Sequence, residues 1–77
     1  MENKLKKIMS ELFDIEVSEI NENSSPDNIE KWDSLNQMNL IVSLEEEFNI
    51  VFTDDDIIEM VSYPLVKLIL KNALHGE

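Results

Sequence analysis

The sequence KWDSLNQMNLIVSLEEEF spans residues 31–48, and its apolar pattern predicts a central helix. At 100° per residue, the apolar side chains fall into two helical stripes on roughly opposite sides. The first stripe suits a hydrophobic core and comprises Leu40, Ile41, Leu44 and Phe48. The second stripe comprises Leu35, Met38 and Val42. Because a small helical bundle has little protein to cover both, we predict that the second stripe is an exposed docking surface. The alternative is that the preceding loop folds back over Leu35 and Met38.

Helical periodicity continues on both sides of this segment. A first helix is predicted by the i, i+3, i+4 spacing of Leu5, Ile8, Met9, Leu12 and Phe13. A short helix is predicted from Thr53, which can form a capping box with Asp56, to about Val61. A last helix is expected to open at Ser62-Tyr63-Pro64, with Pro64 in its first turn, and to stop at Gly76. Its predicted apolar face comprises Leu65, Leu68, Ile69, Ala73 and Leu74. Tyr63 is expected on the surface. Trp32 is expected to pack in the core or loop, and the alternative is that it lines an entrance beside Ser34.

Residues 14–31, DIEVSEINENSSPDNIEK, lose the helical period. We predict a long ordered loop here, pinned by Ile15, Val17, Ile20 and Ile29. No alternating apolar run is long enough to favour a sheet. The expected fold is therefore all-α, a small bundle of three main helices plus one short helix, with a long loop between the first two. A chain of 77 residues predicts a single domain, residues 1–77.

Charge and composition exclude several classes of protein. The chain has 6 Lys+Arg against 17 Asp+Glu, a net charge of −11, which repels nucleic acid and anionic lipid but attracts basic partner surfaces. It has no cysteine and a single histidine, His75, which removes most metal centres, and its acidic runs lack the spacing of a calcium-binding EF-hand, so we expect no metal site. The first residues lack the apolar region of a signal peptide, and no run approaches the ~20 residues that span a bilayer. We expect a cytoplasmic monomer that neither binds nucleic acid nor inserts into membranes.

Asp33 and Ser34 stand where the loop gives way to the central helix. Both residue types are common helix N-caps, so capping is the simplest interpretation. A phosphate ester on Ser34 would also be favoured there, because the free amides and the dipole at a helix N-terminus stabilise anions. No Lys, Cys or His near Ser34 in sequence can act as its base, and no glycine-rich elbow surrounds it. A serine hydrolase is therefore disfavoured, and we predict no catalytic residue.

The Trp32-Asp33-Ser34-Leu35 motif and the run from Leu44 to Phe48, in a strongly acidic helical chain, resemble an acyl carrier protein over essentially the whole length. The resemblance implies that Ser34 carries 4′-phosphopantetheine, transferred from coenzyme A by a magnesium-dependent phosphopantetheinyl transferase. An acyl group would then be held as a thioester on the terminal thiol. The protein would be a substrate of partner enzymes and not an enzyme. The reactive sulfur would arrive with the prosthetic group, which agrees with the absence of cysteine.

The resemblance also implies residues that bind partners. Asp33 would help the transferase to recognise the site. Leu35, Met38 and Val42 match exposed contacts on the family's second helix, and they are the stripe that the angular count identified. Four carboxylates match acidic positions that meet basic patches on acyl-loading and acyl-transfer enzymes: Glu45, Glu46, Asp54 and Asp55.

Some positions depart from the pattern of fatty-acid carriers. The usual Asp-Leu-Gly-x-Asp-Ser-Leu sequence is replaced, because Ile29-Glu30-Lys31-Trp32 precedes Asp33. Asn36, Asn39 and Ile58 stand where acidic residues are common. The Trp-Asp-Ser-Leu form is more typical of specialised carriers, so we expect a free-standing carrier outside bulk fatty-acid synthesis. The alternatives are a D-alanyl or peptidyl carrier, or a helical interaction module without a prosthetic group.

Overall fold

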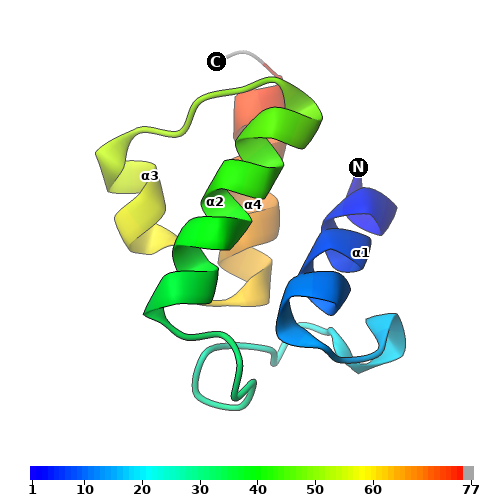
Figure 1. Cartoon of the computed structure of the whole chain (residues 1–77). Coiled ribbons are helices and arrows are strands. Elements are labelled where there is room, and N and C mark those ends of the chain that lie inside the picture. Colours follow the sequence, from blue (N-terminus) through cyan, green and yellow to red (C-terminus); the bar gives the residue numbers. More distant parts are fainter. Residues whose placement is uncertain (76–77) are drawn as a thin grey trace.

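The computed structural model describes residues 1–75 and is built from helices. The elements are α1 (Glu2–Phe13), the 3-10 turn η1 (Val17–Glu19), α2 (Ser34–Phe48), α3 (Asp54–Glu59) and α4 (Tyr63–Leu74). Figure 1 shows α1 and α3 on opposite sides of the α2–α4 pair, with the long loop joining α1 to α2 at the end where α2 begins. This arrangement confirms the predicted all-α bundle of three main helices and one short helix.

One hydrophobic core joins the long helices. The first helix contributes Leu5, Met9 and Phe13, and α2 contributes Leu40, Ile41 and Leu44. Ile8, Leu12 and Phe48 pack against this core in partly buried positions. The apolar face predicted for the first helix and the core stripe predicted for the second are therefore confirmed. Burial of a large apolar side chain contributes about 1.5–3 kcal/mol, so these side chains are the main source of stability.

The apolar face predicted for α4 was wrong in part. The buried side chains of α4 are Tyr63, Val66, Ile69 and Leu70, whereas Leu65, Leu68 and Leu74 are exposed. The reason is that α4 is apolar around most of its circumference, so helical spacing alone fits two different stripes. The predicted stop at Gly76 lies outside the described residues, and α4 ends at Leu74.

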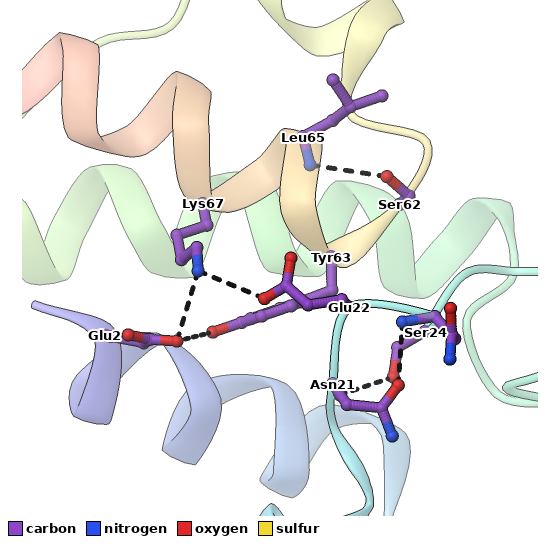
Figure 2. Close-up of polar contacts among 9 residues, drawn as sticks. Glu2, Asn21, Glu22, Ser24, Ser62, Tyr63, Leu65 and Lys67 are labelled. Atoms are coloured by element: carbon purple, nitrogen blue, oxygen red, sulfur yellow. Dashed lines mark hydrogen bonds and ion pairs between the residues drawn. The ribbon is translucent and has the colours of Figure 1, made fainter.

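Tyr63 lies in the core, and the expectation of a surface position was wrong. Its hydroxyl donates a hydrogen bond of 2.6 Å to Glu2 Oε2 at the start of α1 (Figure 2). Its backbone N–H donates to the Ser24 carbonyl in the long loop, at 2.8 Å. Lys67 Nζ lies 3.5 Å from Glu2 Oε2 and 3.3 Å from Glu22 Oε2. Tyr63 thus fastens α4 to both α1 and the loop, because a buried tyrosine combines an apolar ring with a polar tip.

The long loop is held by its own buried residues. Ile20 and Ile29 are buried as predicted, and Ile15 packs partly buried against the core. Val17 does not pin the loop, because its side chain is 45% exposed. At the end of the loop, the Trp32 ring stacks on Phe13, with the ring centroids 5.0 Å apart. The loop therefore delivers the chain to the start of α2 in a fixed position.

The short helix α3 begins as predicted and ends early. Thr53 and Asp56 form the predicted capping box, with hydrogen bonds of 3.0 and 3.2 Å. The helix ends at Glu59 instead of Val61, and Met60 turns into the core. None of the helices in residues 1–75 has the length and apolar character that crossing a bilayer requires.

Candidate functional site

Ser34 is the first residue of α2, and its side chain is exposed. The residue before it is the N-cap, since Asp33 Oδ1 accepts a hydrogen bond of 2.9 Å from the Asn36 backbone N–H. Of the two candidate caps, Asp33 therefore has this role. The Ser34 hydroxyl remains outside the cap, at the end of the helix where the dipole is positive.

Gln37 lies one turn after Ser34 and fixes the base of the site. Its side-chain oxygen accepts from the Trp32 indole N–H, and its side-chain nitrogen donates 3.1 Å to the Met60 carbonyl. Trp32 and Met60 are both buried. The Gln37 amide thus joins the loop before Ser34 to the end of α3, because its oxygen and its nitrogen each make a hydrogen bond.

A shallow groove of about 490 Å³ opens beside Ser34. Most of its lining is apolar and comes from Pro26 and Trp32 of the loop, Met38 of α2, Ile57 and Ile58 of α3, and Met60 and Val61 after α3. Asp33, Ser34 and Gln37 line it as well. Trp32 is buried in the core and also lines the groove. The site is therefore an exposed hydroxyl at the edge of an open groove whose lining is mostly apolar.

Comparisons with known proteins agree with this geometry. The family described as "Phosphopantetheine attachment site" matches residues 3–63. An acyl carrier protein of Buchnera aphidicola subsp. Schizaphis graminum is 41% identical over 56 residues, which cover 73% of this chain and 71% of the relative. An acyl carrier protein of Chlamydia caviae is 39% identical over 56 residues, 73% of each chain. The solution structure of a holo acyl carrier protein from Geobacter metallireducens superimposes with a TM-score of 0.84 at 29% identity, covering 95% of this chain and 84% of that one.

The chain belongs to the acyl carrier protein family. Members of this family are carriers and not catalysts, and their prosthetic group is 4′-phosphopantetheine. An acyl carrier protein interacts with a phosphopantetheinyl transferase and with acyl-processing enzymes. The fold class and the resemblance predicted from the sequence are thereby confirmed.

The exposed apolar stripe of this carrier lies on α2 and continues away from Ser34. Leu35 is 71% exposed, Met38 52% and Val42 48%. The loop before α2 therefore does not fold back over Leu35 and Met38, and the alternative interpretation of the stripe was wrong. Exposed apolar side chains grouped on one helix are typical of a docking surface.

The four acidic residues predicted for partner binding are not equivalent. Glu46, Asp54 and Asp55 are exposed. Glu45 is only partly exposed, and its Oε2 accepts a hydrogen bond of 2.9 Å from the Phe52 backbone N–H. Glu45 therefore holds the connection between α2 and α3, in addition to any contact with a partner.

Asn36 and Gln37 are site residues whose structural roles the sequence analysis missed. Asn36 Nδ2 donates to the Leu12 carbonyl at the end of α1, 3.2 Å away, and to the Lys31 carbonyl, 2.7 Å away. The amide side chains of both residues bind carbonyl groups that are distant in sequence. Local periodicity holds no signal for such contacts, although two adjacent amides after the Asp33 cap could have been noted as candidates.

Proposed function

We propose that Ser34 is the attachment point of 4′-phosphopantetheine and that residues 1–77 act as a single carrier domain. An acyl group would be carried as a thioester on the terminal thiol and delivered to partner enzymes. The main support is the position of Ser34, an exposed hydroxyl on the first residue of a 15-residue helix whose cap is already supplied by Asp33. The serine can therefore be modified without removing a structural hydrogen bond.

The surroundings of Ser34 fit the prosthetic group. A phosphodiester on Ser34 Oγ would lie at the N-terminus of α2, where backbone amides and the dipole favour negative charge. The apolar groove beside it could receive the uncharged part of the arm. The new Oγ–phosphorus bond would form as the phosphoanhydride bond of coenzyme A breaks, adenosine 3′,5′-bisphosphate would leave, and the serine proton would pass to the transferase. This chain would supply only the acceptor oxygen.

Partner enzymes would bind the face of the protein that surrounds Ser34. The proposed contacts are the apolar stripe of Leu35, Met38 and Val42 and the acidic residues Asp33, Glu45, Glu46, Asp54 and Asp55. Glu45 would contribute less than the others because the Phe52 N–H already engages its carboxylate. Each exposed ion pair with a basic partner contributes about 0.2–1 kcal/mol and weakens with salt. Such weak contacts suit a carrier that must dock and then leave.

We further propose that this carrier serves a specialised pathway rather than bulk fatty-acid synthesis. Asn36 donates hydrogen bonds to two carbonyls, which an ionised acid at that position could not do. Ile58, where an acidic residue is common in fatty-acid carriers, is 72% exposed. A D-alanyl or peptidyl carrier is the alternative.

We also propose that the protein is a monomer and acts in the cytoplasm. The net charge of −11 supports a monomer, because two copies repel each other.

The decisive experiment is intact-mass analysis after incubation with coenzyme A, Mg²⁺ and a broad-specificity phosphopantetheinyl transferase. We expect a gain of one phosphopantetheine in the wild type and in Ser18→Ala, a matched change at an exposed serine of η1. The gain should be absent in Ser34→Ala. If the wild type gains no mass with any transferase, the protein is a helical interaction module without a prosthetic group, and the proposal fails.

A further inference from the structure

A second groove lies on the other side of α3, between the α2–α3 connection and α4. Its volume is about 560 Å³, and its apolar lining includes Ile50, Val51, Leu65, Leu68 and Ala73. Val51 is 84% exposed and Leu68 is 51% exposed. Val51 and Leu68 are costly to leave in water, and within residues 1–75 they remain at least half exposed.

The short helix α3 separates this groove from the one beside Ser34. Ile57 and Ile58 line the Ser34 groove, whereas Asp56 and Glu59 line the second one. In Figure 1 the α2–α3 connection and α3 lie to one side of α4, away from α1. A molecule bound in the second groove would therefore leave Ser34 accessible.

The ionisable side chains that line the second groove are both acidic. Among residues 1–75 they are Asp56 and Glu59, and no Lys or Arg lines the groove. A second copy of this chain is a poor occupant, because each copy carries a net charge of −11. The complementary occupant has an apolar surface flanked by Lys or Arg.

The backbone of the occupant is restricted as well. Residues 1–75 contain no β-strand, so an extended segment would find no sheet edge with which to pair its N–H and C=O groups. A helix satisfies these groups internally and can present an apolar stripe to a groove. Leu65 and Leu68 stand three residues apart on α4, a spacing that forms a ridge against which another helix packs.

We propose that the groove between the α2–α3 connection and α4 is a second docking surface, which binds a cationic amphipathic helix of a partner protein. Bound there, the carrier would be held by one protein while the Ser34 face remains free for another. The proposal does not depend on the prosthetic group, since none of the groove residues lies in the Ser34 site.

The test uses the ¹⁵N-labelled full chain carrying Ser34→Ala, titrated with a 14-residue helical peptide of Leu and Lys. The same peptide with Glu in place of Lys is the charge control. We expect amide shift changes at residues 50–53 and 65–73 with the Lys peptide only, with a dissociation constant fitted from those residues. Absence of changes there, or equal changes with the Glu peptide, would overturn the proposal.

Two matched substitutions localise the binding. Leu68→Lys and Val17→Lys each add one positive charge at a side chain that is about half exposed, 51% and 45% respectively. We expect Leu68→Lys to weaken binding at residues 65–73 at least tenfold and Val17→Lys to change it by less than twofold. Equal weakening by the two variants would show that the peptide responds only to net charge, and the second docking surface would be rejected.

Discussion

Two adjacent residues at the start of α2 have separate roles. Asp33 caps the helix and Ser34 does not, so the two alanine variants should differ in the unmodified protein. Asp33→Ala should lower the free energy of unfolding by about 0.5–2 kcal/mol, because the Asn36 N–H loses its partner. Ser34→Ala should change it by less than about 0.5 kcal/mol. Urea denaturation followed by circular dichroism measures both, and Asp33→Asn, which can still cap, is the control. An equal loss in the two alanine variants would contradict the assignment of the cap.

Gln37 should be important for stability, although it lies near the surface on α2. Gln37→Ala leaves the buried Trp32 indole N–H and the Met60 carbonyl without their partner. A buried polar group left unpaired costs about 1–3 kcal/mol, and we expect a loss of that size. Asn39→Ala on the same helix removes an exposed amide and should cost less than about 0.5 kcal/mol. Urea denaturation of both variants tests this, and a loss for Gln37→Ala no larger than that for Asn39→Ala would show that water replaces the Gln37 contacts.

At the scale of elements, the sequence predicted where the helices lie along the chain better than it predicted which face of each helix is buried. The starts of α2 and α3 followed from Asp33 and Thr53, since caps are local signals. The buried face of α4 did not follow, because YPLVKLILKNAL offers apolar residues on nearly every side. The choice between stripes depends on packing against parts of the chain that are distant in sequence, as in the bond from Tyr63 to Glu2, 61 residues away, and no local pattern encodes such contacts. Ser34 was proposed from its motif, and it stays a prediction. The roles of Asn36 and Gln37 depend on carbonyl groups distant in sequence, and they were not predicted.

The two stripes of α2 give a sharp prediction at neighbouring positions. Ile41 is 3% exposed and faces the core, whereas Val42 is 48% exposed and lies on the stripe that we propose for docking. Val42→Glu should leave the melting temperature nearly unchanged but lower kcat/KM for a partner enzyme about tenfold, which corresponds to ~1.4 kcal/mol. Ile41→Glu should unfold the protein, because it buries a charge without a partner. Thermal denaturation and thioester-loading kinetics test both variants. A large fall in melting temperature for Val42→Glu would place that stripe in the core.

At the scale of the whole molecule, the contact between Glu2 at the start of α1 and Tyr63 at the start of α4 should weaken in acid. The hydrogen bond from Tyr63, with the charge of Lys67 beside it, lowers the pKa of the Glu2 carboxyl below its usual value. Because the pKa is lower in the folded state, the stabilisation is present above the unfolded pKa of about 4.3 and is lost as the pH falls through the folded value. Burial and the same bond raise the pKa of Tyr63, so its contribution is complete below pH ~10.

The corresponding experiment compares Glu2→Gln with the wild type across pH. The difference in free energy of unfolding should be present at neutral pH and should shrink as the solution is acidified below about pH 4. Glu16→Gln, a change at an exposed carboxylate before η1, controls for the loss of one negative charge. A difference that stays constant with pH would mean that the Glu2 carboxylate does not contribute through its ionisation.

Trp32 lies two residues before Ser34 and stacks on Phe13, and this position has a practical consequence. Trp32 is the only tryptophan of the chain, and it lines the groove beside the serine. Indole emission depends on the polarity around the ring, so the unlabelled protein contains its own optical reporter at the place where cargo would be attached. Loading and unloading could then be followed in real time by fluorescence, without adding a dye to a surface that partners need.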